Sequence, residues 1–417
     1  MAAPARTYHL VTLGCPKNQV DSDKLEGTLV GDGMQAVDDP SDADMVVVNT
    51  CAFIEEARTQ SIDTILELSD RNPDAELVVT GCLAERSGDE LASALPEIDR
   101  VAGFGVPVAL SPRRPTTPSL DLLELARPAS TRPWAYVKIA EGCDRACGFC
   151  AIPSFRGPQR SRSIDAIVAE VEALDVAEAV LVAQDLAAYG RDQGRGSRDL
   201  VPLVDALRGR VDWIRMLYLY PSDLDDRLVE SVLSTGVPYF DLSLQHVSRP
   251  LLRAMRRWGD GDRFVQRIEA IRSVAPDAVF RSNFIVGYPG ETEDDHDALL
   301  RFVEAVQLDW CGFFTYSREA GTHADTLDHH VPTTLMLERH AELTELQDGI
   351  TAARRDQMVG RRVEVLVDEQ GVARSRAEAP EIDGVIEVPT ELAVGRFHTV
   401  DIVAALGPDL VATEVCS

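Results

Sequence analysis

Three cysteines near the middle of the sequence constrain this chain more than any other feature. They are Cys143, Cys147 and Cys150, in the spacing Cys-x3-Cys-x2-Cys, and they follow the apolar residues 134–140. Three thiolates on one short loop can bind three corners of a cubane iron–sulfur cluster and leave the fourth iron without a protein ligand. An open metal position is typical of catalytic sites. A zinc knuckle or a chance cluster is the alternative, but zinc would need a fourth ligand, and the next Cys or His is the distant His246.

The spacing resembles the signature of the radical S-adenosylmethionine (SAM) enzymes. In that family the open iron binds the amino and carboxylate groups of SAM. An electron from the cluster then cleaves SAM to a 5′-deoxyadenosyl radical. The resemblance implies a 4Fe–4S cluster on Cys143, Cys147 and Cys150, with SAM as cofactor and an electron donor as partner.

Length and composition predict a cytoplasmic protein of two or three domains. The chain has 417 residues, of which 45% are apolar. No apolar run approaches the ~18 residues of a transmembrane helix, and residues 1–6 lack the pattern of a signal peptide. In a reducing compartment, eight cysteines favour metal binding or catalysis over disulfides. The net charge of −28 favours basic partners over phosphate backbones, although it could serve solubility alone.

Three more cysteines each follow a predicted strand of the N-terminal segment. Residues 8–14 end at Cys15, residues 45–50 end at Cys51, and residues 76–81 end at Cys82. Helical patterns between them, such as residues 53–69, predict a parallel α/β sheet. Ligands of open α/β sheets bind at the carboxyl ends of the strands, so three cysteines there predict a second site with three thiolates. A single cysteine would instead be an ordinary small core residue.

The rest of the chain predicts a barrel and then a small β domain. Six strands alternate with helices and indicate a partial (β/α)6 barrel, whose active face lies at the carboxyl ends of the strands. They are residues 135–140, 179–185, 214–220, 239–245, 278–287 and 311–317. Residues 358–417 are rich in β patterns and predict a small antiparallel β-barrel, connected by a helix over residues 333–358. The predicted domains are residues 5–112, a proline-rich linker 113–132, the barrel 133–356, and residues 357–417.

Several motifs together resemble the radical SAM methylthiotransferases over nearly the whole chain. They are Gly14-Cys15-Pro16-Lys17-Asn18, Asn49-Thr50-Cys51, Thr80-Gly81-Cys82, Glu141-Gly142-Cys143 and Gly287-Tyr288-Pro289-Gly290-Glu291-Thr292. The terminal segment is similar to a TRAM domain. One branch of the family modifies an adenosine in transfer RNA, and the other modifies the β-carbon of an aspartate of small-subunit ribosomal protein 12. The Pro16-Lys17-Asn18 form, Leu244-Gln245-His246 and Ala379-Pro380-Glu381-Ile382-Asp383 resemble the second branch.

The acidic terminal segment also favours the basic ribosomal protein. It carries five arginines against eleven Asp and Glu residues, whereas a tRNA enzyme gains affinity from phosphate contacts. Nucleic acid contact is therefore expected to be secondary at most. Glu381 and Asp383 are expected at the rim of the contact with the ribosomal protein, and the alternative is that they only shape a turn before Gly384.

The resemblance implies roles for the cysteines. Cys15, Cys51 and Cys82 would hold a second 4Fe–4S cluster that carries the sulfur, and no other catalytic residue is assigned. Strand ends give the candidate SAM contacts Gln184, Gln245, Gly287 and Gly290, although the glycines also fit a plain strand-to-helix turn. Arg156, Arg160 and Arg162 are expected to be salt-bridged or solvated, and the alternative is that one of them holds the target aspartate by a bidentate contact. Two further residues are predicted to have structural roles: His246 as a structural histidine and Cys311 as a core residue.

Overall fold

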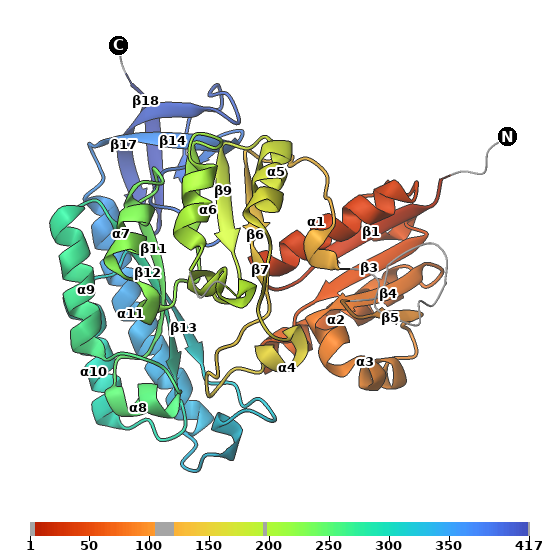
Figure 1. Ribbon diagram of the computed structural model, residues 1–417, viewed down its shortest axis with the longest axis horizontal. Helices are drawn as coiled ribbons and strands as arrows, with labels where there is room; N and C mark the ends of the chain where they lie inside the picture. The colour runs from red at the N-terminus through yellow and green to blue at the C-terminus, as the bar shows by residue number, and fades with distance from the viewer. Residues whose placement is uncertain (1–4, 105–120, 195–197, 416–417) are drawn as a thin grey trace.

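Three parts follow one another along the chain of the computed structural model (Figure 1). They are an N-terminal α/β sheet, a partial barrel of six parallel strands, and a small closed β-barrel, as predicted. The structure describes residues 5–104, 121–194 and 198–415. The beginning of the predicted linker, residues 113–120, lies outside the described residues, and its remainder contains the short helix η2 (Leu122–Glu124).

The N-terminal sheet is parallel, in the order β2-β1-β3-β4-β5. Its strands are β1 (Thr7–Thr12), β2 (Gln35–Ala36), β3 (Met45–Thr50), β4 (Glu76–Gly81) and β5 (Arg100–Ala102). The connecting helices are η1 (Pro40–Asp42), α1 (Pro16–Gly31), α2 (Glu55–Arg71) and α3 (Cys82–Ala94). Every residue of the central strand β3 is buried, as expected for a parallel sheet covered on both faces. The carboxyl ends of β1, β3 and β4 consequently share one edge of the sheet.

Two glycines let the strand ends approach each other closely. Gly14 follows β1 with φ +98°, and a Cβ added to it would lie 2.8 Å from Cys51 Sγ. Gly81 ends β4 with φ +89°, where a Cβ would overlap the Asn49 side chain and the backbone of Thr50. Only glycine combines this backbone conformation with such close contact. The residues just before Cys15 and Cys82 are therefore part of the geometry of that edge.

Six parallel strands form the partial barrel in two three-stranded sheets, joined by a bridge between Leu219 and Leu242. The strands are β6 (Trp134–Lys138), β9 (Glu178–Val182), β10 (Trp213–Met216), β11 (Tyr239–Gln245), β12 (Val279–Val286) and β13 (Trp310–Thr315). Their side chains alternate between two cores. Ala135 and Val137 pack with the outer helices, while Trp134 and Tyr136 pack in the barrel interior.

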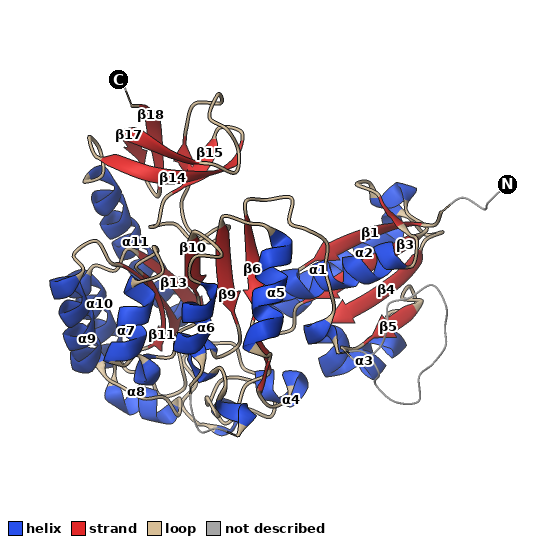
Figure 2. Ribbon diagram, turned by 45° about the horizontal axis from the view of Figure 1, so that its top comes forward, coloured by secondary structure: helices blue, strands red, loops and turns tan. Residues whose placement is uncertain are grey.

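Helices cover the outside of the barrel (Figure 2). The longer ones are α5 (Ile164–Leu174), α6 (Leu200–Leu207), α7 (Asp226–Leu233), α9 (Gly261–Val274), α10 (Glu293–Val306) and α11 (Thr333–Asp356). The short elements are β7 (Ala140–Glu141), β8 (Arg160–Ser161), α4 (Ile152–Arg156), α8 (Arg249–Ala254), η3 (Leu186–Ala188), η4 (Arg191–Gln193), η5 (Pro221–Asp223) and η6 (Ala324–Thr326). None of the described helices combines the length and apolar character needed to cross a bilayer.

The terminal β-barrel closes in the order β14-β15-β16-β18-β17. Its strands are β14 (Arg362–Glu369), β15 (Val372–Arg374), β16 (Ile386–Glu387), β17 (Phe397–Leu406) and β18 (Asp409–Glu414). Four of the five pairings are antiparallel, and β16 pairs with β18 in parallel. The sequence did not predict β15, which has three residues, or β18, which is partly exposed and begins and ends with acidic residues.

A loop of the terminal barrel closes the amino-terminal end of the larger barrel. Tyr136 donates to the Pro380 carbonyl oxygen at 2.8 Å, and Trp310 Nε1 donates to the carbonyl oxygen of Ala377 at 2.8 Å. Trp310 is the first residue of β13 and Tyr136 lies before the carboxyl end of β6, so this loop covers the end of the barrel opposite to the Cys143 loop.

Asp383 lies inside this closure rather than at a binding rim. Its carboxylate accepts hydrogen bonds from the Tyr239 hydroxyl at 2.5 Å and from the Ala379 amide at 2.8 Å, and its side chain is 2% exposed. Burial raises the pKa of Asp383 to about 6. The expectation of a rim position is wrong for Asp383. Glu381 is half exposed, and it pairs with Arg132.

Candidate active site

The Cys143–Cys150 loop is fixed by backbone hydrogen bonds from several sides. It joins β7 to α4 beyond the carboxyl end of β6. Gly148 donates to the carbonyl oxygen of Met255 at 2.8 Å and accepts from the Ala324 amide at 2.7 Å. Cys143 donates to the Gly157 carbonyl oxygen at 3.1 Å. Segments far away in the sequence therefore hold the loop on the active face of the barrel.

The thiols of this loop lie close enough to influence one another. Burial, together with the smaller effect of the nearby Cys147, raises the pKa of Cys143 to about 11 and that of Cys150 to about 12. One cation contacts the group, because Arg257 Nη1 lies 3.3 Å from Cys147 Sγ. Thiols in such a place stay protonated unless a metal displaces their protons. The donor set fits a thiolate-bound iron–sulfur cluster.

An arginine–tyrosine stack lies beside this loop. The guanidinium groups of Arg257 and Arg145 both lie over the Tyr220 ring, 4.3 Å and 3.8 Å from its centroid. Arg145 also forms ion pairs with Asp185, at 2.5 Å, and with Asp223. Asp185 is therefore engaged in an ion pair at the end of β9.

The other three cysteines meet at the carboxyl edge of the N-terminal sheet. Cys15 caps α1, Cys51 follows β3, and Cys82 begins α3. Burial raises the pKa of Cys51, and it raises that of Cys82 to about 11. Burial also raises the pKa of Cys15, but Lys17, Arg156 and two backbone amides outweigh it, and the pKa is lowered overall. Three mutually interacting thiols beside cations fit an anionic thiolate cluster.

Neither triad is arranged as a site for one ion. Within residues 5–104, 121–194 and 198–415, no three His, Cys, Asp or Glu side chains converge closely enough to hold a single metal. A cubane cluster has a different geometric requirement, because each of its thiolates binds a different iron atom.

Arg156 connects the two triads. It ends α4, six residues after Cys150, and its side chain is 3% exposed. Its Nη2 lies 3.0 Å from Cys82 Sγ and donates to Asn18 Oδ1 at 2.6 Å. Its Nη1 lies 3.0 Å from carboxylate oxygens of Asp21 and Glu141. The guanidinium of Arg156 thus contacts a cysteine of the N-terminal triad, while the residue itself belongs to the helix that follows the loop of the barrel triad.

Lys138 completes this buried network. It lies in β6 and binds Asp21 of α1 at 2.6 Å and Glu141 of β7. Gln184 donates to Glu141 Oε1 at 2.9 Å. Although burial raises the pKa of Glu141, Arg156 and Lys138 lower it to about 2 overall. Two cations facing two carboxylates therefore bind the N-terminal domain to the barrel between the two triads.

Similarity to known proteins places the chain in a family. Residues 7–103 match the model described as uncharacterized protein family UPF0004, residues 137–303 the radical SAM superfamily, and residues 359–415 the TRAM domain. The chain is 39% identical to the ribosomal protein uS12 methylthiotransferase RimO of Cutibacterium acnes, over 97% of both chains. It is 40% identical to the RimO of Aquifex aeolicus, over 97% of this chain and 96% of that one. The chain belongs to the RimO family.

A comparison with solved structures gives a weaker match. The cobalamin-dependent radical SAM enzyme OxsB aligns with a TM-score of 0.48 at 12% identity, over 81% of this chain and 56% of that one.

The candidate SAM contacts of this RimO family member have differing surroundings. Gln184 is bonded to Glu141, and Gln245 ends β11 with φ +71°. Gly287 donates to Glu291 Oε2 at 2.6 Å, and a Cβ on it would overlap Met336, so its small size is used in packing. Gly290 has φ +88° and open space around it.

His246 and Cys311 have structural surroundings. His246 is fully buried, and its Nδ1 accepts from the Ser248 amide at 3.0 Å. Burial lowers the pKa of His246 to about 4. Cys311 lies in β13 and packs against the outer barrel core, as predicted.

The three arginines proposed for substrate binding already have acidic partners. Arg156 binds Asp21 and Glu141, as described above. Arg160 forms an ion pair with Asp121 at 2.5 Å, and Arg162 forms one with Glu170 at 2.6 Å. These pairs remove the basis for assigning the substrate aspartate to any of the three.

Sequence reasoning missed Lys17 and Arg257 as site residues. Lys17 follows Cys15 by two positions, and this proximity was the signal that could have identified it. Arg257 lies far from Cys147 in sequence and meets it only through the fold.

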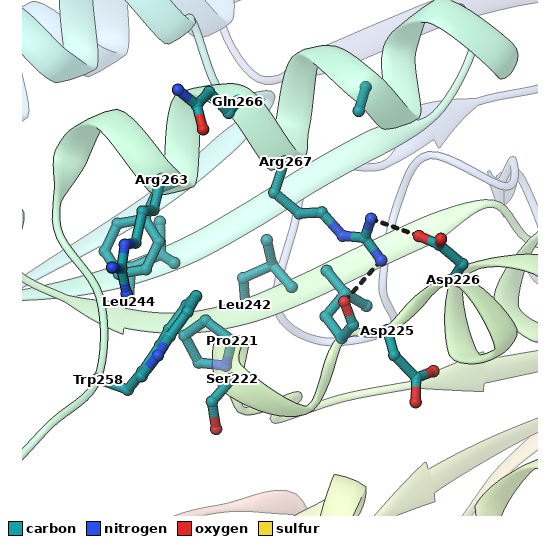
Figure 3. A pocket seen from close by; sticks show the side chains of 13 residues that line it. Pro221, Ser222, Asp225, Asp226, Leu242, Leu244, Trp258, Arg263, Gln266 and Arg267 are labelled. Atoms are coloured by element: carbon teal, nitrogen blue, oxygen red, sulfur yellow. Dashed lines mark hydrogen bonds and ion pairs between the residues drawn. The ribbon is translucent and has the colours of Figure 1, made fainter.

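A pocket of about 560 Å³ lies beside α9 (Figure 3). It is lined by α9, the start of α7 and two outward-facing leucines of β11, with Trp258 among the lining residues. Arg267 extends across it to Asp226, at 2.7 Å. None of the six cysteines lines the pocket.

Proposed function

We propose that this chain is a radical SAM enzyme that adds a methylthio group to the β-carbon of an aspartate of ribosomal protein uS12. The domain at residues 5–112 would hold the sulfur-carrying cluster, residues 133–356 would cleave SAM, and residues 357–417 would complete the enzyme after the linker 113–132. The reaction needs SAM and an external electron donor, and both the protein and its substrate would be cytoplasmic.

The observation that carries this proposal is the pairing of two cysteine triads through one buried network. Cys143, Cys147 and Cys150 would hold the cluster that binds SAM, and Cys15, Cys51 and Cys82 a second 4Fe–4S cluster. When bound, these groups would supply a carbon radical and a transferable sulfur, which a side-chain base could not replace because an aspartate β-C–H is not acidic near neutral pH. Relatives that are 39–41% identical over nearly their full length are named ribosomal protein uS12 methylthiotransferases, which supports the same substrate.

The protein's own residues position the two groups relative to each other. Arg156 and Lys138 bind Asp21 of α1 to Glu141 of β7, so the N-terminal sheet cannot shift without separating buried charges. This arrangement would keep the sulfur at a constant distance from the radical.

Mass spectrometry of the product tests the proposal. Reconstituted protein with sulfide as the sulfur source, a reductant, and SAM as both methyl donor and radical source should add one methylthio group to purified uS12, located by fragmentation at an aspartate. The same reaction with bulk tRNA tests the alternative, an adenosine methylthiotransferase. Modified tRNA with unmodified uS12 would reverse the assignment. The net charge of −28 favours the basic protein.

A further inference from the structure

The proposed reaction requires a cation beside the N-terminal triad. The reacting β-carbon of aspartate is directly bonded to the carboxylate carbon. A sulfur donor that meets this carbon must therefore stand next to the carboxylate as well. Moving a carboxylate into such a buried place is costly unless a positive group receives it.

Lysine is rare in this chain, and this makes each lysine informative. The sequence contains Lys17, Lys24 and Lys138 as its only lysines, among 41 basic Lys and Arg residues. All three are buried. Lys24 lies 3.6 Å from Glu170, and Lys138 lies 2.6 Å from Asp21. A buried lysine with a carboxylate partner is an ordinary structural ion pair.

Lys17 differs from the other two. It is 9% exposed, and none of the carboxylates that the structure describes lies within ion-pair distance of it. Its Nζ lies over the ring of Tyr218, 3.5 Å from the centroid. Cation–π contact stabilises a desolvated ammonium by about 2 kcal/mol, which is less than a carboxylate partner would supply.

The carboxylates nearest to this place along the chain and the barrel are already bound. Asp21, one turn further along α1, binds Lys138 and Arg156. Asp241 accepts from the Tyr218 amide at 2.9 Å and pairs with Arg281 at 3.0 Å. Among the described residues Lys17 therefore has no carboxylate partner, and its ammonium lies between Cys15 and the Tyr218 ring.

We propose that the Lys17 ammonium binds the carboxylate of the target aspartate. This inference rests on the proposed function and deepens it by naming the residue that recognises the substrate side chain. Lys17 follows Cys15 by two residues, so a carboxylate held there presents its β-carbon to the N-terminal triad. A compact ammonium leaves room for that approach, whereas a guanidinium would extend further.

A double-mutant cycle tests this contact. The variants are Lys17→Gln in the enzyme and Asp→Asn at the modified position of uS12. Affinities are measured with the reconstituted enzyme and SAM, without reductant, so that no turnover occurs. Wild-type enzyme should bind the Asp form roughly 10- to 100-fold more tightly than the Asn form. Lys17→Gln should bind the two forms about equally. Undiminished discrimination in Lys17→Gln would overturn the inference.

Two controls separate recognition from other roles of Lys17. The first uses protein in which Cys143, Cys147 and Cys150 are changed to Ala, so that only the N-terminal cluster remains. Its midpoint potential should become more negative when Lys17→Gln is added, because a cation near Cys15 is lost, and this shift should occur with and without uS12. A shifted potential together with preserved Asp/Asn discrimination would assign Lys17 to the cluster instead. The second control, Lys24→Gln, removes a buried lysine from the same helix and should lower stability without changing the discrimination.

Replacement variants, and the behaviour of the wild-type enzyme, separate failure of this inference from failure of the proposed function. If Lys17→Gln assembles no clusters, Lys17→Met, which keeps an unbranched side chain one atom shorter and without a polar group, replaces it in the same cycle. Lys17→Arg retains the charge but needs more room, so it should retain only part of the discrimination. Wild-type enzyme that modifies uS12 but does not distinguish Asp from Asn in binding overturns this inference alone. Failure of wild-type enzyme to bind or modify uS12 overturns the proposed function and the inference with it.

Discussion

The two cysteine triads are built in different ways. Cys143, Cys147 and Cys150 lie within eight residues of one loop, so local backbone geometry brings them together. The N-terminal triad is assembled from three strand ends, and its thiols meet only because the strands of one parallel sheet stop at the same edge. Spacing alone reveals the first site, whereas the second depends on the topology of the sheet.

The surroundings of the triads differ as well. The barrel triad has Arg257 on Cys147 and Arg145 near Cys143, but Asp185 pairs with Arg145 and raises the pKa of Cys143. The N-terminal triad has Arg156 on Cys82 and Lys17 near Cys15, and both cations act on the pKa of Cys15. A more positive environment stabilises additional negative charge. The N-terminal site is therefore the better place for an anionic sulfur ligand and an anionic substrate side chain.

Removing the barrel triad should have the largest effect. Changing Cys143, Cys147 and Cys150 to Ala should abolish SAM cleavage and lower the iron content from about eight to about four per chain. Anaerobic reconstitution, iron analysis and chromatography of 5′-deoxyadenosine measure this. Persistent 5′-deoxyadenosine formation in the triple variant would show that the loop does not hold the SAM-binding cluster.

Removing the N-terminal triad should separate the two activities. Changing Cys15, Cys51 and Cys82 to Ala should also leave about four irons, but SAM cleavage should persist while methylthio transfer stops. The barrel triad keeps its own loop contacts, such as Gly148 with Met255. Full methylthiolation of uS12 by this variant would rule out the strand ends as the sulfur site.

Arg156→Gln should weaken the connection between the sites. It leaves Asp21 and Glu141 with Lys138 as their remaining buried cation and takes a donor from Cys82. We expect a loss of about 3–5 kcal/mol in the free energy of unfolding. The midpoint potential should become more negative for the N-terminal cluster and stay constant for the barrel cluster. Arg160→Gln, which breaks an exposed pair with Asp121, should cost less than about 1 kcal/mol and shift neither potential.

Two glycines with nearly the same φ give a matched test of the strand-end geometry. Gly81→Ala places a Cβ against Asn49 and Thr50 at φ +89°, whereas Gly290→Ala has the same backbone strain at φ +88° with open space around it. Gly290→Ala should cost about 1 kcal/mol of stability from strain alone. Gly81→Ala should cost about 1–3 kcal/mol more and reduce iron incorporation at the N-terminal triad. Equal costs in thermal unfolding would show that the strand ends are not tightly packed.

The sequence predicted what local patterns determine. The six barrel strands, the bounds of α5 and the three cysteine-bearing strand ends follow from hydrophobic periodicity, and the structure bears them out. The sequence could not predict the burial of Asp383 or the pairing of β16 with β18. These depend on how the terminal barrel packs on a distant part of the chain. The partners of Arg156 were missed for the same reason, because Asp21 is 135 residues away.

The buried network and the barrel face should respond to acid in different pH ranges. Glu141 has a folded pKa of about 2, below its usual value of 4.5. The stability that this carboxylate contributes is fully present above pH 4.5 and is lost as the pH falls through about 2. Between pH 7 and pH 5 the network of Arg156 and Lys138 should therefore contribute no pH dependence.

His246, on the barrel side, should make the stability depend on pH between pH 7 and pH 5, where Glu141 contributes no pH dependence. Burial lowers its folded pKa from 6.5 to about 4, with His296 and Arg339 acting in the same direction and Asp295 opposing them. Between these values the unfolded chain binds more protons, so stability falls as the pH drops below 6.5. At pH 5.5 the expected loss relative to pH 7.5 is about 1 kcal/mol, the smallest of the expected effects. His246→Asn keeps an acceptor for the Ser248 amide but removes the titration, and it should lose about 1 kcal/mol less between these pH values in urea unfolding. An unchanged pH slope in this variant would place the acid sensitivity outside the barrel end of β11.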